Sequence, residues 1–136
     1  QDIRQNGQWF GKLAIGREWV LGDEVSRISR IRGVFGQNEL KTTHRGNRTR
    51  PVRIVQLWIV DDLQRRQRTS LKLPKELEGA MDCLRQRAPA AIFGKYDSRE
   101  YDELAYAEEE EWHAKEREYQ QRKARMAEQE HSFQGW

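Results

Sequence analysis

The sequence has a single cysteine, only three prolines and no long apolar run. Because Cys83 has no partner for an intrachain disulfide, a reducing, cytoplasmic compartment is expected rather than a secreted one. The sequence contains no run of about 18 apolar residues, so no transmembrane helix is expected. No signal peptide is visible either. The chain starts at Gln1 without an initiator methionine, so the sequence leaves open a membrane anchor in an upstream segment.

Motifs for catalysis and metal binding are also lacking. His44, His113, His131 and Cys83 do not have the spacing of metal ligands. No glycine-rich motif for a phosphate or dinucleotide is present, and no serine lies in a nucleophile-elbow motif. Adjacent carboxylates fall at expected turns, where turn chemistry explains them. We therefore expect no catalytic residue, no metal and no cofactor, which indicates a non-enzymatic protein.

Charge is present in quantity and is unevenly distributed. The 136 residues carry a formal net charge of +3, and 35% of them are charged. Residues 1–99 hold 20 Lys/Arg and 11 Asp/Glu, whereas residues 100–136 hold 5 and 11. A basic body with an acidic tail favours anionic partners, which include nucleic acid, phospholipid headgroups and acidic protein surfaces.

The first half of the chain predicts short strands and a long basic connection. Residues 9–16 and 18–21 have the aromatic and aliphatic content of strands bounded by glycines. Residues 23–35 predict a short helical turn capped by Asp23 and then a strand. Residues 36–51 are polar and basic, which indicates a long basic loop or the tip of a hairpin.

The middle of the chain gives the strongest predictions. Residues 52–60 are rich in β-branched and aromatic residues on both parities, which is typical of a strand covered on both faces. Residues 65–73 form a more polar strand, so the two predict an antiparallel hairpin. Pro74 opens a helix over residues 75–87, where Leu77 begins an apolar stripe at helical spacing.

The last segment predicts one long charged helix that starts at Asp97, with Glu100 completing a capping box. Its apolar stripe fades beyond Glu108, so we expect a solvated tail that frays before Trp136. Deleting residues 112–136 should then leave the melting temperature of the body nearly unchanged. The chain divides accordingly into a compact strand-rich domain, residues 1–97, and a charged helical extension, residues 98–136.

The basic connection is the best candidate for a binding site. Arginine forks suit phosphate oxygens of lipid headgroups or of nucleic acid. Eight residues could form one positive ridge there: Lys41, Arg45, Arg48, Arg50, Arg53, Arg65, Arg66 and Arg68. A solvated, arginine-rich surface without a ligand is the alternative reading. Aromatic residues are not interleaved with these arginines, which makes nucleic acid the less favoured anion.

The order of elements resembles that of bacterial pleckstrin-homology-like domains. The resemblance rests on Gly16–Val20, on the helix from Leu77 to Leu84, on Ala88–Pro89 and on Ile92–Tyr96. It implies a strand-rich sheet closed by a helix, and a binding scaffold without catalytic residues. The sequence indicates four or five strands where the family has seven, so complete barrel closure does not follow from it.

Together these features predict an α+β fold with an antiparallel sheet, a PH-like and partly closed barrel as one form of it, one amphipathic helix and a long charged C-terminal helix. The expected function is a non-enzymatic binding or scaffolding module. Its partners would be an anionic membrane surface or a protein, which could be a second copy bound through the C-terminal helix. The alternative is a nucleic-acid-binding protein or a subunit of a ribonucleoprotein assembly.

Overall fold

The computed structural model describes residues 1–134, with side chains described as far as Glu130. Its helices are α1 (Asp2–Asn6), α2 (Pro74–Arg87), α3 (Arg99–Ala105) and α4 (Glu109–Gln134), with a 3-10 turn η1 (Ile28–Arg30). Its strands are β1 (Gln8–Phe10), β2 (Leu13–Ile15), β3 (Trp19–Leu21), β4 (Val25–Arg27), β5 (Ile31–Arg45), β6 (Arg48–Asp61), β7 (Arg66–Leu71) and β8 (Ile92–Lys95). The side chain of His131 lies outside the described part of the chain. So does Trp136, before which the tail is expected to fray.

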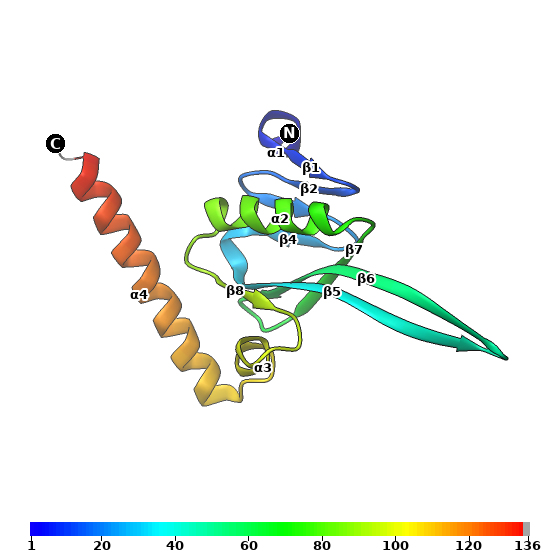
Figure 1. Ribbon diagram of the computed structural model, residues 1–136. Coiled ribbons are helices and arrows are strands. Elements are labelled where there is room, and N and C mark those ends of the chain that lie inside the picture. Colours follow the sequence, from blue (N-terminus) through cyan, green and yellow to red (C-terminus); the bar gives the residue numbers. More distant parts are fainter. Residues whose placement is uncertain (135–136) are drawn as a thin grey trace.

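The strands form two four-stranded sheets, and α2 lies across them (Figure 1). The first sheet has the order β1-β2-β3-β4 and is antiparallel throughout. The second has the order β7-β6-β5-β8, in which only β8 runs parallel to its neighbour. The α+β class is therefore confirmed. A closed barrel is absent from the described residues, and seven strands precede α2 rather than the four or five that the sequence indicated.

Helix α2 forms where the sequence predicts it. The Glu76 carboxylate accepts hydrogen bonds from the backbone N–H groups of Lys72 and Leu73, at 3.0 and 2.9 Å, which ends the preceding strand segment and starts the helix. Leu77, Ala80 and Leu84 are buried on one side of the helix. They join residues of both sheets in the main hydrophobic cluster, so α2 holds the two sheets together.

Strand β6 is covered on both faces, as its composition predicts. Val55, Leu57 and Ile59 point into the main cluster beneath α2. Val60 faces the other way, into a second cluster of buried residues. The second cluster contains Phe35, Val60, Tyr101, Leu104 and Ala105. Because β6 has a hydrophobic layer on each side, it is the strand that the two clusters share.

The two sheets are also joined at the edge of β7. The carboxylates of Asp23 and Glu24 accept hydrogen bonds from the backbone N–H groups of Ser70 and Arg68, both at 2.9 Å. The prediction that Asp23 caps a helical turn is therefore wrong: β4 follows it, and the turn η1 comes only afterwards. These carboxylates satisfy the free donors of an edge strand, which would otherwise be open to pairing with another chain.

The single long helix expected after Asp97 is instead two helices. Ser98, and not Asp97, caps α3, because its hydroxyl accepts the Tyr101 N–H at 3.3 Å. The chain then leaves helical geometry between α3 and α4. There the side-chain amide of Gln64 donates to the carbonyl oxygens of Leu104, Ala105 and Ala107, at 3.1, 3.2 and 2.8 Å. Gln64 thus binds the last carbonyl groups of α3, a contact that a sequence pattern does not reveal.

Helix α4 is docked on the body over its first half, contrary to the prediction of a solvated tail. The guanidinium of Arg32 donates to both carboxylate oxygens of Glu116, at 2.7 and 3.1 Å, and lies 3.8 Å from the ring centroid of Tyr119. Tyr119 is 7% exposed. Arg122 donates to the carbonyl oxygen of Ala90 at 2.9 Å. From Lys123 to Glu130 every residue of α4 is exposed, so only this later part matches the prediction.

Candidate anion-binding site

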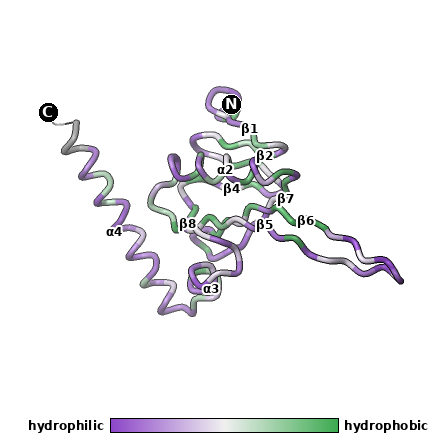
Figure 2. The backbone as a smooth tube through the Cα atoms, in the orientation of Figure 1, coloured by the Kyte–Doolittle hydropathy of each residue, from purple (hydrophilic) through white to green (hydrophobic). Residues whose placement is uncertain are grey.

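The outer parts of β5 and β6 form a two-stranded arm that projects from the body on the side away from α4 (Figure 1). We call residues 40–53 the arm. Every residue in it is exposed, and Figure 2 shows hydrophilic residues along its outer length. Six residues of each strand extend about 20 Å at the usual rise of a β-strand. The prediction of a long loop or hairpin tip over residues 36–51 is thus resolved as a continuous β-ribbon.

A two-residue turn, Gly46–Asn47, closes the arm. Gly46 has φ +61°, the left-handed region in which a side chain is strained. A glycine with positive φ at the first central position is typical of the type II′ turn, whose twist matches that of the flanking strands. The turn fixes the register, so Arg45 lies opposite Arg48 and Thr43 lies opposite Arg50.

Four of the predicted site residues share one face of the arm. Residues directly opposite each other in an antiparallel pair point to the same side of the sheet. The pairing therefore places Arg45, Arg48 and Arg50 on one face, together with Lys41, which lies opposite Val52. No Asp or Glu occurs between Leu40 and Arg53. The nearest acidic partner is Glu39, whose carboxylate lies 3.5 Å from the Lys41 ammonium at the root of the arm.

The other four predicted residues are not part of this cluster. Arg53 lies opposite Leu40 on the reverse face, where it donates to the Asn38 side-chain oxygen at 2.7 Å. Arg65 lies in the turn after β6 and forms a 2.8 Å ion pair with the buried Asp61. The single ridge expected from the sequence is thus divided.

Arg66 and Arg68 point to the same side of the sheet as Lys41, Arg45, Arg48 and Arg50. They lie on β7, however, far from the arm. Arg68 is the cross-strand partner of Trp58, which is eight residues, or roughly 27 Å, along β6 from Arg50. Arg68 lies 5.8 Å from the Trp58 ring centroid, and Arg66 lies 4.7 Å from that of Tyr106. Both are exposed, so they retain donors for a ligand while contacting aromatic rings.

An aromatic cluster packs around β5 and β6 in the body, several residues before the arm begins. Trp58 stacks on Tyr96 with ring centroids 4.4 Å apart, and its indole N–H donates to the Gln37 side-chain oxygen at 2.9 Å. Tyr101 packs edge-on against Phe35 with centroids 5.1 Å apart, and burial raises the pKa of Tyr101 to about 12. Tyr101 is therefore a neutral packing residue. Because β5 and β6 run uninterrupted from this cluster into the arm, the arm has a fixed origin.

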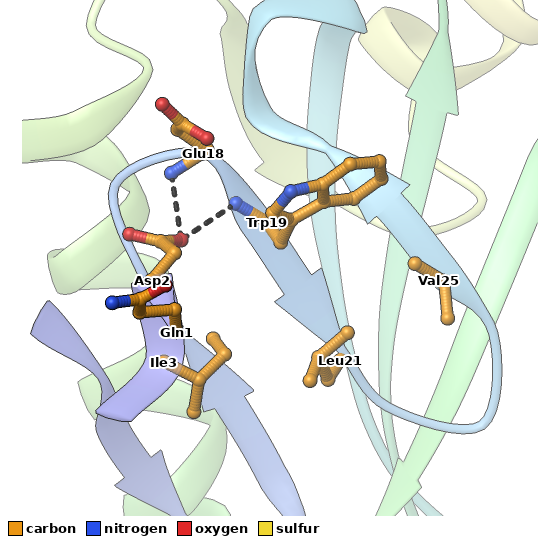
Figure 3. Close-up of a pocket in the computed structure, with 7 residues that line it drawn as sticks. All are labelled: Gln1, Asp2, Ile3, Glu18, Trp19, Leu21 and Val25. Carbon is orange, nitrogen blue, oxygen red and sulfur yellow. Dashed lines mark hydrogen bonds between the residues drawn. The ribbon is translucent and has the colours of Figure 1, made fainter. Parts of the chain in front are cut away.

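A separate hollow of about 470 Å³ lies beside α1 and β3 (Figure 3). Its walls include Ile3, Trp19, Leu21 and Val25. The carboxylate of Asp2, one of two acidic residues that line it, accepts the N–H groups of Arg17, Glu18 and Trp19, at 3.0, 2.9 and 3.1 Å. The Glu18 bond is the largest cause that lowers the pKa of Asp2 to about 2. The carboxylate therefore fastens the β2–β3 turn and has no proton to exchange near neutral pH.

Other reactive groups are isolated from one another. Cys83 is buried in α2, and burial raises the pKa of its thiol, which leaves it protonated. His113 lies 3.8 Å from Glu109 on the exposed side of α4. In the described part of the chain, no three His, Cys, Asp or Glu side chains gather as metal ligands would. None of the described helices has both the length and the apolar character needed to cross a membrane.

Comparison with protein-family models, with curated proteins and with solved structures finds no match for this chain. The resemblance to pleckstrin-homology-like domains therefore stays a prediction. The arm is exposed at every residue and belongs to neither hydrophobic cluster, which makes it the candidate site for a ligand.

Proposed function

We propose that this chain is a non-enzymatic binding protein that recognises a polyanionic partner through the arm. One observation carries the proposal: a projecting β-ribbon, exposed at every residue, presents Lys41, Arg45, Arg48 and Arg50 on one face and has no acidic residue between Leu40 and Arg53. A ribbon that served only to complete the sheet would end where the core ends, near Glu39.

The cross-strand pair of Arg45 and Arg48 supports an anionic ligand. Like charges directly opposite each other destabilise a two-stranded ribbon. An anion placed between the two guanidinium groups removes this repulsion and accepts hydrogen bonds from both forks. Repulsion between the two arginines therefore lowers the stability of the free arm, and a bound polyanion removes this loss.

The fold supports a scaffold role for the remainder of the chain. Seven strands precede α2, which agrees in number with the family that the sequence resembles, and that resemblance implies a binding scaffold. The two hydrophobic clusters hold the roots of β5 and β6 from both sides. The exposed part of α4 beyond Arg122 is the surface that we propose for a protein partner or a second copy.

Heparin chromatography tests the polyanion site without assuming a natural ligand. The test variant carries Arg45→Gln, Arg48→Gln and Arg50→Gln. The control variant loses the same charge from exposed arginines on α2 and α4: Arg85→Gln, Arg117→Gln and Arg125→Gln. We expect the test variant to elute at a clearly lower salt concentration than wild type, and the control to elute close to wild type.

Equal elution of the two variants would contradict the proposal, because it would show that heparin senses only net charge. The arm would then be a solvated surface, and the search for function should move to protein partners of α4.

A further inference from the structure

The dimensions of the arm fit the groove of a nucleic-acid duplex better than a flat anionic surface. Neighbouring strands lie about 4.8 Å apart, and the arm extends about 20 Å. The major groove of B-DNA is about 12 Å wide and 8.5 Å deep, and it admits a two-stranded β-ribbon. We propose that the polyanion is a DNA duplex and that the arm lies in its major groove. This inference rests on the polyanion-binding function proposed above and specifies the partner.

The tip of the arm has the chemistry of base and phosphate contacts. The turn Gly46–Asn47 is flanked by Arg45 and Arg48, which can each bind guanine O6 and N7 with two donors. Asn47 offers the amide pair that matches adenine N6 and N7. Threonine hydroxyls also lie along the arm, and such groups contact phosphate and sugar oxygens. These are Thr42, Thr43 and Thr49, all exposed.

The same tip is poorly suited to a lipid bilayer. Elements that insert into a membrane interface place tryptophan, phenylalanine or leucine at the depth of the acyl chains. No such residue occurs from Lys41 to Arg50. The exposed apolar residues of the arm, Leu40 and Val52, lie at its root, 63% and 39% exposed and on opposite faces. A bilayer that reached them would first have to accommodate the whole charged tip.

A cation also lies on the reverse face of the arm. Arg53 is exposed there, opposite Leu40. A flat anionic surface contacts one face of a ribbon, so a cation on the other face contributes little. In a groove, phosphates line both walls, and both faces of the ribbon lie close to negative charge. Lys41, Arg50 and Arg53 then contact the backbone, while the tip residues reach the bases.

Fluorescence anisotropy with a labelled DNA duplex of about two helical turns, roughly 20 base pairs, tests the inference. For the three phosphate contacts of Lys41, Arg50 and Arg53, the slope of log K against log salt should be about −3. The variant with Arg45→Gln and Arg48→Gln should bind about tenfold or more weakly with a nearly unchanged slope, because these two residues contact bases rather than phosphates. Its matched control, Arg85→Gln with Arg117→Gln, should retain wild-type affinity.

Chemical protection locates the groove. Guanine N7 lies in the major groove and adenine N3 in the minor groove, and dimethyl sulfate methylates both. Bound wild-type protein should protect guanine N7 and leave adenine N3 reactive. Protection of adenine N3 instead would overturn the major-groove placement, even where the affinity is high.

Parallel titrations with a single strand of the same length, an RNA duplex and vesicles containing phosphatidylserine separate the inference from the function beneath it. Tighter binding to the single strand, to RNA or to vesicles than to duplex DNA would refute the DNA inference and leave the polyanion function standing. Failure to bind any of the four, combined with equal elution of the heparin variants, would refute both.

Discussion

Replacing Glu116 by alanine removes the carboxylate that joins α4 to β5. In the wild type, Nε and Nη2 of Arg32 donate to the two Glu116 oxygens at 2.7 and 3.1 Å, and Nη1 donates to the Ser29 carbonyl at 3.0 Å. The Arg32 side chain is only 9% exposed. The variant therefore leaves a guanidinium charge largely shielded from water with no anion beside it.

The magnitude follows from the exposure of the two partners. Removing one partner of a fully buried ion pair costs about 3–5 kcal/mol, and a single charge-assisted hydrogen bond contributes about 1.5–3 kcal/mol. Because the Glu116 side chain is 30% exposed, water reaches part of the pair. We expect Glu116→Ala to lower the free energy of unfolding by about 2–3 kcal/mol. Glu118→Ala, at an exposed position of the same helix, should change it by less than about 0.5 kcal/mol.

Urea unfolding followed by circular dichroism measures both variants. The hydrogen bond from Arg32 is the main cause that lowers the pKa of Glu116 below its ordinary value of 4.5. A carboxyl whose pKa is lower in the folded state stabilises the fold above pH 4.5, and this stabilisation is lost as the pH falls through the folded-state value. The acid limb of the stability curve should therefore be shallower in Glu116→Ala. Equal stability of Glu116→Ala and Glu118→Ala would refute the docking of α4.

Two further contacts give predictions of their own. Asp2→Asn should lower the melting temperature at pH 7, and since the pKa of Asp2 is about 2 when folded and 3.8 otherwise, only the wild type should lose this part of its stability between pH 4 and pH 2. A melting series over that range checks the sign. Gln64→Ala should cost about 1–2 kcal/mol in urea unfolding, because it frees the carbonyls that end α3. Gln64 has a φ of +61°, and because glutamine and alanine both carry a Cβ, the left-handed backbone is strained by a side chain in either protein.

The elements that the sequence predicted correctly are those with strong local patterns. Helix α2 has a proline at its start and an apolar stripe through Leu77 and Leu84, and each signal lies within one segment. The hairpin of β6 and β7 was predictable because residues 52–60 are apolar on both parities. In these segments, local preference and burial agree, so no distant residue is needed to choose the structure.

The docking of α4 could not be read from the sequence. Arg32 and Glu116 are 84 residues apart, and each belongs to a segment whose charges indicate solvent exposure. Tyr119 lies in a helix without an apolar stripe, yet it is buried because the Arg32 guanidinium covers its ring. Helix α4 packs through the Arg32–Glu116 pair, the hydrogen bond from Arg122 and two aromatic residues, Trp112 and Tyr119, so its contacts are mostly polar and form no continuous apolar stripe.

The sequence predicts the basic residues of the arm but not the faces on which they lie. The basic residues were identified from composition, but their division between two faces depends on the register that the Gly46–Asn47 turn sets. A Gly-Asn pair between two runs of threonine and arginine is compatible with a hairpin. The alternation of apolar and polar residues that marks a strand is missing, however, because neither face of the arm is buried.

The opposed arginines of the tip connect the arm's stability with its proposed ligand. Arg48→Glu replaces a like-charge pair with an opposite-charge pair, which should stabilise the ribbon by about 0.2–1 kcal/mol. In the free protein, amide hydrogen exchange in the arm should therefore slow relative to wild type, while heparin and duplex affinity should fall. Adding duplex to the wild type should slow the same amides. If Arg48→Glu left exchange unchanged, the two guanidinium groups would not repel each other, and relief of repulsion would not be a reason for the arm to bind a polyanion.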